Sequence, residues 1–397
     1  MQKPALALLL LSLGFVACAE DPRQPVVHPG AAPTVTRHPK GTLAEQVAVV
    51  AAKSQPRTLG MDAASHALDV ASASAELAAE PTPVACQLNE TSRAAGLYLN
   101  DARSPGRVAL TFDDGPHPGK TPRVLDLLQQ HGLHATFFVV GAAIRPTTYH
   151  LLQRMVAEGH VIGSHSYNHD IKMATRRPGR GSIDYVRGQH EVTRILIDLA
   201  LMAQSADDFT RLYRRIFEQK EVVYLPASAL RRWPTYFERH RALLEEAGYV
   251  EGTRPYAVLY SRPPGGAPYL EPSEPWQREV YDTALAEAGL VNVMWHDESG
   301  DTNPEKRHDF AFLTANLQRG FKRGGVVLVH DYIRSDALST ALSAAFAPVA
   351  QTRPQIVPLA ELAQDKFGCD ETTLRASLSP RGEPQTRVAT AATSAVR

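Results

Sequence analysis

Short apolar runs alternate with amphipathic segments between Gly106 and about Gly368. The apolar runs predict strands at about residues 107–112, 135–140, 160–163, 256–260, 291–294 and 325–329. Between these runs the spacing predicts helices, the first capped by Thr121 with Pro122 as its first residue, and others near residues 151–158, 275–288 and 310–317. Near-continuous apolar strands separated by helices are typical of a parallel sheet. The pattern therefore predicts an α/β fold, a single (β/α) barrel, within residues 106–370.

A helical pattern without strand signals fills residues 184–250. Apolar side chains there, such as Ile195, Leu199, Phe209 and Leu212, recur close to helical spacing. We interpret this stretch as a helical insertion that packs on the barrel. A lid or a partner-binding surface beside the site is the alternative.

The two ends of the chain have a different composition. Residues 19–105 are rich in Ala, Pro, Thr and Ser, which predicts a low-complexity tether, and residues 371–397 predict a flexible tail. The whole chain of 397 residues is 44% apolar, as a globular protein is, and its 42 basic residues balance 42 acidic ones. That charge balance argues against nucleic acid as the main partner.

One long apolar run lies at the N-terminus. Ala5 to Ala17 follow Lys3 and are too few to cross a hydrocarbon core of ~30 Å, so residues 1–18 are expected to be a secretory signal. The segment Phe15-Val-Ala-Cys18 resembles a bacterial lipobox, in which Cys18 would carry lipid; an ordinary cleaved signal peptide is the alternative. Either way we expect an exported protein of the cell envelope, periplasm or exterior, touching the membrane only through such an anchor.

Cys86 and Cys369 remain if Cys18 is lipidated. Export permits a disulfide, and these two cysteines flank the apolar part of the chain. We expect a bridge between them, with two unpaired thiols as the alternative.

Polar side chains follow five of the predicted strands. They are Asp113 and Asp114, His165 and His169, Arg262, Asp297 and Asp301, and His330 and Asp331. Because the carboxyl ends of parallel strands meet on one face of a barrel, where such enzymes keep their active sites, we expect a shared site.

Asp114, His165 and His169 offer one oxygen and two imidazole nitrogens. Two histidines four residues apart can point the same way from a helical turn or a tight loop. Three protein ligands leave a coordination position open for water, as in catalytic zinc sites. These residues therefore predict a metal site.

The remaining residues suggest a hydrolysis. Asp113 is the candidate base, and Arg262 would pair with it and keep it ionised. His330 is the candidate acid for the leaving nitrogen or oxygen, held by Asp301 or alternatively by Asp297 or Glu298. Together with a metal, this set describes the hydrolysis of an acyl group.

Four segments carry a resemblance to a known family. They are Thr-Phe-Asp-Asp-Gly-Pro at 111–116, His-Ser-Tyr-Asn-His at 165–169, Arg-Pro-Pro-Gly at 262–265 and Leu-Val-His-Asp at 328–331. The chain resembles the polysaccharide deacetylase family, the carbohydrate esterases with a NodB homology domain. The resemblance implies an irregular barrel of about seven strands, a Zn²⁺ or another divalent cation such as Co²⁺, and removal of acetyl groups from an N-acetylated sugar polymer such as peptidoglycan, chitin or poly-N-acetylglucosamine. The bond broken would be a non-peptide carbon–nitrogen bond.

Two segments depart from the family pattern. Gly265 stands where the family usually has an aromatic residue, whose backbone N–H helps to bind the oxyanion. In the segment Trp295–Thr302, Glu298 and Thr302 replace the usual Asp and Trp. These departures motivate one alternative, a glycan-binding protein on the same barrel with little or no turnover. A further alternative, which would use the same catalytic residues, is an esterase that removes O-acetyl groups from a xylan-type polymer.

Overall fold

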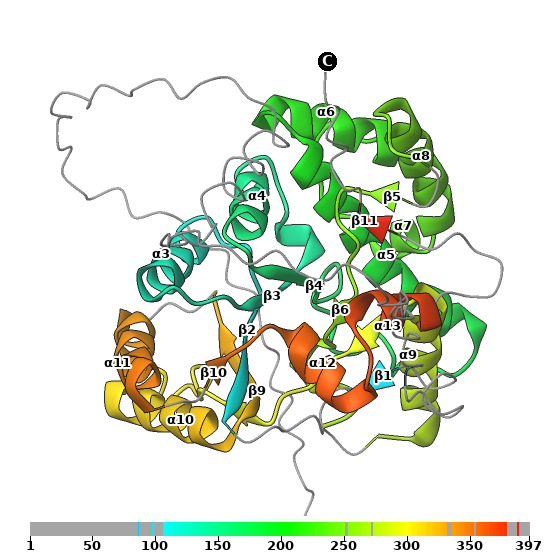
Figure 1. Ribbon diagram of the computed structural model, residues 1–397. Helices are drawn as coiled ribbons and strands as arrows, with labels where there is room; N and C mark the ends of the chain where they lie inside the picture. The colour runs from blue at the N-terminus through cyan, green and yellow to red at the C-terminus, as the bar shows by residue number, and fades with distance from the viewer. Residues whose placement is uncertain are drawn as a thin grey trace, which may run out of the picture. The chain divides into compact units, whose positions relative to one another are not determined.

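A sheet of nine strands, every pair of them parallel, is the framework of the fold (Figure 1). The computed structural model describes Cys86 and residues 97–98, 106–250, 253–270, 273–331, 336–352, 355–378 and 387–388. The order along the sheet is β1-β7-β6-β4-β3-β2-β9-β8, with β10 paired to the start of β2. The predicted α/β class with a parallel sheet is confirmed, and within the described residues the sheet is curled but its outer strands β1 and β8 are not paired with each other.

The strands are short outside the middle of the sheet. Their bounds are β1 Leu97–Tyr98, β2 Arg107–Asp113, β3 Thr136–Val139, β4 Val161–Ser164, β6 Tyr260–Ser261, β7 Val291–Asn292, β8 Asp297–Glu298, β9 Gly325–His330 and β10 Gln355–Ile356. A separate pair joins β5 Thr253–Arg254 to β11 Arg387–Val388. Strands β2 and β9 are long and almost wholly buried, as their runs of Val, Leu and Phe predict.

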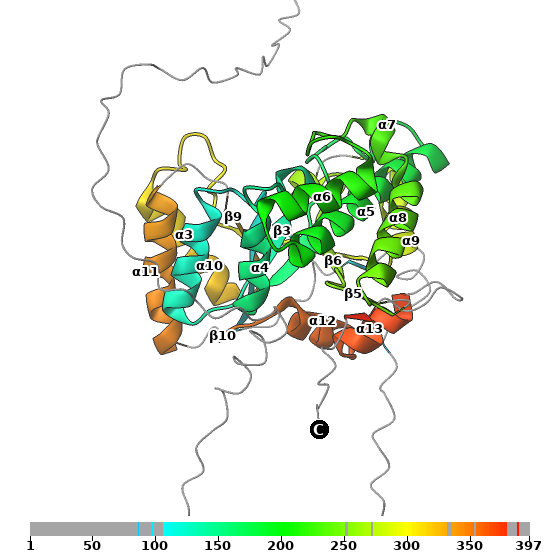
Figure 2. The same cartoon turned by 90° about the horizontal axis from the view of Figure 1, so that it is seen from above.

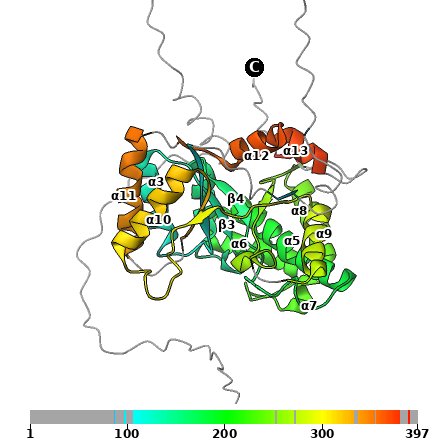
Figure 3. The same ribbon diagram turned by 90° about the horizontal axis from the view of Figure 1, so that it is seen from below.

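Helices cover the sheet from two sides. Their bounds are α3 Thr121–His131, α4 Tyr149–Ala157, α5 Arg180–Met202, α6 Ala206–Phe217, α7 Ala227–Leu230, α8 Trp233–Glu246, α9 Pro275–Ala288, α10 Phe310–Arg323, α11 Asp336–Thr352, α12 Leu359–Phe367 and α13 Glu371–Leu378. Helices α3, α10 and α11 group on one side of the strands and α5, α8 and α9 on the other (Figures 1 and 3). Helix α12 lies at the end where β2 begins, since Arg107 forms ion pairs with its residues Glu361 and Asp365 (Figure 2).

Two local predictions are corrected. Thr121 is the first residue of α3 and not its cap; its hydroxyl accepts a hydrogen bond from the His117 N–H and donates one to Asp331. The strand expected at 256–260 is reduced to β6. The Tyr256 hydroxyl accepts the N–H of Ile162, so a side chain takes the place of a ladder bond there.

The predicted insertion is helical and forms α5 to α8. Many apolar side chains of these helices are buried, as expected for an insertion that packs on the rest of the fold. They include Ile195, Leu199, Phe209, Leu212 and Ile216. Helix α5 carries buried residues along nearly its whole length and contacts α4, α6, α8 and α9.

Cys86 and Cys369 form a disulfide with a Cα–Cα distance of 5.0 Å, as the sequence predicted.

The signal peptide, Cys18 and almost all of the predicted tether lie outside the described residues, although β1 falls within the tether range and pairs with β7. Residues 371–378 belong to the predicted flexible tail but form α13. The side chain of Leu374 is fully buried, which holds this helix against the rest of the fold. Among the helices described, none combines the length and the apolar character needed to cross a bilayer.

Candidate active site

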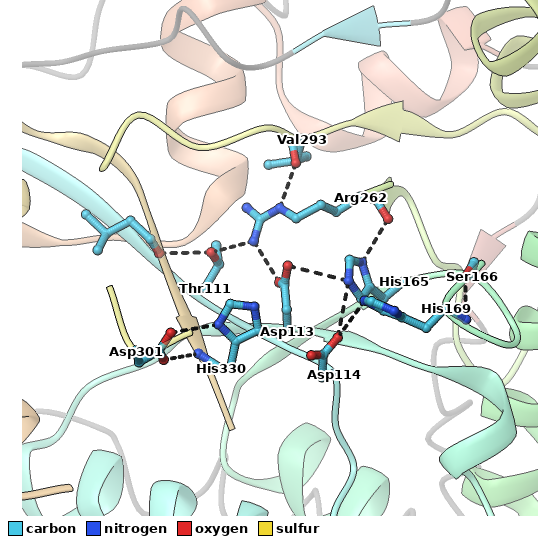
Figure 4. Close-up of polar contacts among 11 residues, drawn as sticks. Thr111, Asp113, Asp114, His165, Ser166, His169, Arg262, Val293, Asp301 and His330 are labelled. Carbon is cyan, nitrogen blue, oxygen red and sulfur yellow. Dashed lines mark hydrogen bonds and ion pairs between the residues drawn. The ribbon is translucent and has the colours of Figure 1, made fainter. Parts of the chain in front are cut away.

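Each of the five predicted groups contributes a residue to one site, at the ends of strands β2, β4, β6 and β9 and in the turn after β8 (Figure 4). Asp297 is not part of it, because it is the first residue of β8 and pairs with Arg323. Asp113 is the last residue of β2 and His330 the last of β9, and they are register partners. His165 follows β4 and Arg262 follows β6, and the Arg262 N–H donates to the Ser164 carbonyl. The parallel sheet therefore sets the spacing between these side chains.

Asp114 Oδ1 lies 3.4 Å from His165 Nε2 and 3.1 Å from His169 Nε2. The ligand atoms that these three residues offer lie within 4.8 Å of one another. Ser166 and His169 both have positive φ values, 64° and 55°, so the two histidines converge from a tight loop and not from a helical turn. The three residues expected to hold a metal are therefore brought together.

The donor atoms fit a divalent cation. His165 Nδ1 lies 2.9 Å from the Arg262 carbonyl oxygen, which only accepts, so Nδ1 carries a hydrogen and Nε2 of the neutral ring presents its lone pair to Asp114. Asp114 Oδ1 is buried without a hydrogen-bond partner. Acceptors that face one another at this distance need a cation or added protons between them, and one oxygen with two imidazole nitrogens is a donor set for Zn²⁺ and its neighbours.

Without a metal, the contacts among Asp114, His165 and His169 shift the pKa values of Asp114 and His169. Burial raises the pKa of Asp114, but His165 and His169, which donate hydrogen bonds and carry charge once they are protonated, outweigh burial and hold that pKa well below the usual range. The pKa of His169 is lowered by burial and raised more strongly by Asp114. The site therefore favours a carboxylate with positive charge beside it.

Asp113 is fixed by Arg262. The guanidinium Nη1 donates to Asp113 Oδ1 at 2.7 Å and to Thr111 Oγ1 at 2.8 Å, while Nε donates to the Val293 carbonyl at 2.8 Å. Arg262 is fully buried and its guanidinium lies over the ring of Phe138, 4.2 Å from the centroid. Arg262 therefore orients Asp113 through Oδ1 and leaves Oδ2 free, 3.7 Å from His165 Nε2.

Asp301 holds His330. The His330 backbone N–H donates to Asp301 Oδ2 at 2.8 Å, and the ring Nδ1 lies 2.9 Å from Asp301 Oδ1. Burial lowers the pKa of His330, but Asp301 and the nearby aspartates outweigh it and raise that pKa to about 9. Of the alternatives for this role, Asp297 pairs with Arg323 and Glu298 is exposed, so neither contacts the ring.

Asp331 lies behind this group. Its Oδ2 accepts from Thr121 Oγ1 at 2.7 Å, and a Cβ at Gly115 would lie 2.1 Å from the same oxygen, so only glycine fits beside it. Burial and the charges of Asp114 and Asp113 raise the pKa of Asp331 to about 7. The carboxyl thus ties the end of β9 to the first residue of α3.

Two contacts escaped the sequence analysis. Gln189 on α5 binds the loop between His165 and His169, and nothing in its sequence context marks it. Ile171 Cγ2 lies 3.3 Å from where a Cβ of Gly265 would be, and Ile171 is 51% exposed. The aliphatic side chain of Ile171, two residues after His169, therefore lies beside Gly265, which departs from the aromatic residue that the resemblance implies at this position.

Comparison with known proteins agrees with the site. Residues 100–197 match the family model described as polysaccharide deacetylase. A peptidoglycan-N-acetylglucosamine deacetylase of Listeria monocytogenes is 27% identical over 238 residues, which cover 60% of this chain and 35% of that protein. One from Bacillus cereus is 50% identical over 62 residues, 16% of this chain and 29% of the relative. The chain thus matches about a third of the length of these relatives.

Among solved structures, a carbohydrate esterase family 4 pseudoenzyme from Bacillus anthracis is similar with a TM-score of 0.43 and 19% identity. That match covers 66% of this chain and 67% of the other.

Proposed function

Because this chain belongs to the polysaccharide deacetylase family, we propose that it is a metal-dependent hydrolase that removes N-acetyl groups from an amino-sugar polymer. The observation that carries the proposal is the buried, unpartnered Asp114 Oδ1 facing the Nε2 atoms of His165 and His169. Asp113 and His330, at the ends of paired strands beside this cluster, supply a base and an acid.

Asp114, His165 and His169 would hold the divalent cation. When bound there, the cation supplies Lewis acidity to the acetyl carbonyl and to a water molecule. Asp113 takes a proton from that water at Oδ2, since Oδ1 is occupied by Arg262. Arg262 orients Asp113 for this step.

His330 gives a proton to the leaving nitrogen. Its Nδ1 hydrogen is committed to Asp301, so the proton leaves from Nε2. With the pKa raised to about 9, the ring carries this proton at neutral pH. Water and the N-acetyl sugar thereby yield a free amine and acetic acid, which ionises to acetate in solution; one proton is taken by Asp113 and one given by His330.

The substrate class follows from chemistry and from the relatives. The relatives from Listeria and Bacillus are named as deacetylases of peptidoglycan N-acetylglucosamine, and one from Sinorhizobium fredii as a chitooligosaccharide deacetylase. We therefore place N-acetylglucosamine polymers first among the substrates. The Cys86–Cys369 disulfide supports export, since such bonds persist in oxidising compartments; an anchor at Cys18 remains part of the proposal.

Acetate release tests the function. The purified protein is incubated with peptidoglycan, chitin oligomers, poly-N-acetylglucosamine and acetylxylan, with and without a chelator and with Zn²⁺ or Co²⁺ restored. We expect release from an N-acetylated polymer, lost with chelator and regained with metal. Release from acetylxylan alone would identify an O-acetyl esterase, and polymer binding without any release would identify a glycan-binding protein.

A further inference from the structure

Gln189 on α5 makes its hydrogen bonds to the loop that joins His165 to His169. Its Oε1 accepts the backbone N–H of Tyr167 at 2.9 Å and that of Asn168 at 3.2 Å. Its Nε2 donates to Asn168 Oδ1 at 2.6 Å. We propose that Gln189 is a positioning residue that sets the metal affinity of this site through the loop, an inference that rests on the proposed metal-dependent function.

The loop needs an acceptor at this position. Ser166 and His169 both have positive φ values, 64° and 55°, a conformation that side chains other than glycine rarely adopt. Such a conformation persists only where its surroundings fix it.

Three other polar groups of the turn also have partners. The carbonyls of Ser166 and Tyr167 accept from the N–H groups of Gly141 and Ala142, and the His169 N–H donates to Ser166 Oγ. The N–H groups of Tyr167 and Asn168 have Gln189 as their partner. Since Tyr167 is 2% exposed, water does not readily replace that partner.

His169 depends on the loop more than His165 does. The Arg262 carbonyl fixes the Nδ1 of His165, whereas among the described residues no hydrogen bond fixes the Nδ1 of His169. The side chain of His169 is 40% exposed, against 2% for His165. The orientation of the second ligand therefore follows from the backbone that Gln189 holds.

Gln189 itself is held firmly. It is fully buried, and its Nε2 also donates to the hydroxyl of Tyr185, which donates to Asp170 Oδ2, next to His169. Helix α5 thus binds the loop at Tyr167, Asn168 and Asp170. This gives the helical insertion a role in the site: its first helix carries the support of a metal ligand.

Metal titration of two matched variants tests the inference. Gln189→Met keeps the volume and removes the hydrogen bonds to the loop. Gln153→Met is the control, because Gln153 Nε2 binds the carbonyls of Ala200 and Ala203 at the other end of α5, where no residue of the site lies. Each chelator-treated protein is titrated with Zn²⁺ alone by calorimetry, and circular dichroism establishes that it is folded.

Support of a metal ligand by outer residues is worth roughly 10- to 100-fold in metal affinity, so we expect Q189M to weaken Zn²⁺ binding by that factor. Q153M should bind as the wild type does. Equal affinities of Q189M and the wild type would overturn the role of Gln189 and leave the proposed function intact. A wild-type protein that binds no metal would overturn the proposed function, and this inference with it.

Two milder variants keep the inference testable if Q189M does not fold. Gln189→Glu retains an acceptor for both backbone N–H groups, and the Asn168 amide can turn to donate to it, so Zn²⁺ affinity should stay near that of the wild type. Asn168→Ala removes one of the contacts and should weaken Zn²⁺ binding less than Q189M does. Loss of affinity in Q189E equal to that of Q189M, or unchanged affinity in N168A when Q189M is unfolded, would contradict the inference.

Discussion

Asp113 and His330 are register partners at the ends of the neighbouring parallel strands β2 and β9. Each is oriented by a buried partner: Arg262 binds Asp113 and Asp301 binds His330. The backbones of these two residues thus lie about 5 Å apart, the spacing of neighbouring strands. This arrangement suits a reaction that takes a proton from one group and gives one to another.

Asp113→Asn tests the base. The amide keeps the shape and a hydrogen-bond acceptor for Arg262 but cannot take a proton, so we expect metal content to stay and acetate release to fall by roughly 10²- to 10⁴-fold. Elemental analysis and an acetate assay measure the two effects. Substantial residual turnover in this variant would refute the base assignment.

His169→Ala tests the metal site. Removing one of three ligands should lower bound metal and acetate release together. His308, an exposed histidine outside the site, gives the control variant His308→Ala, which should keep full occupancy. Unchanged metal content in H169A would remove His169 from the ligand set.

Asp301→Asn tests the acid through pH. The pKa of His330 is raised to about 9, and Asp301 contributes most to the increase. Activity that needs the protonated ring should therefore fall above that pH in the wild type. In D301N the fall should begin at lower pH. A pH–rate profile measures the shift, and identical alkaline limbs would exclude His330 as the group that titrates.

The same pKa bears on stability. Because it is raised above the ordinary value of 6.5, the ring contributes stability that is complete below about pH 6.5 and lost as pH rises through about 9. Urea unfolding at the two ends of this range should show a larger loss for the wild type than for His330→Gln. Equal losses would contradict the raised pKa.

Ile171→Ala tests whether the side chain beside Gly265 contacts the substrate. Ile171 is half exposed and stands two residues after His169, where a sugar ring near the metal would meet it. Removing about 1 kcal/mol of apolar contact should raise KM about fivefold and leave kcat nearly unchanged. Val250→Ala, at an exposed position before β5, is the control; an unaltered KM in I171A would place the substrate elsewhere.

Cys86→Ser combined with Cys369→Ser tests the disulfide. The bridge spans 283 residues, so its loss should lower the free energy of unfolding by about 2–5 kcal/mol. Urea unfolding of the variant, and of the wild type with reductant, should give the same loss. Equal stability in all three samples would show that the thiols are not bridged.

The sequence by itself determined the α/β class, because apolar runs long enough for buried strands alternate with helical patterns. It also determined the composition of the candidate site, because in a parallel sheet residues that follow strands lie at one edge wherever they fall in the chain. Asp113, Asp114, His165, His169, Arg262 and His330 could all be chosen on that ground, with no knowledge of distances.

Only the tertiary structure decided among the acidic residues near His330. The sequence offers Asp297 and Glu298 as alternatives to Asp301 within five residues. The turn after β8 brings Asp301 to the ring, while Asp297 pairs with Arg323. Gln189 likewise acquires its contacts from the packing of α5 against residues 165–169. The Thr121 hydroxyl, which the sequence predicted to cap a helix, instead donates a hydrogen bond to Asp331, 210 residues away. Such contacts join residues distant in sequence, so local periodicity and propensity carry no trace of them.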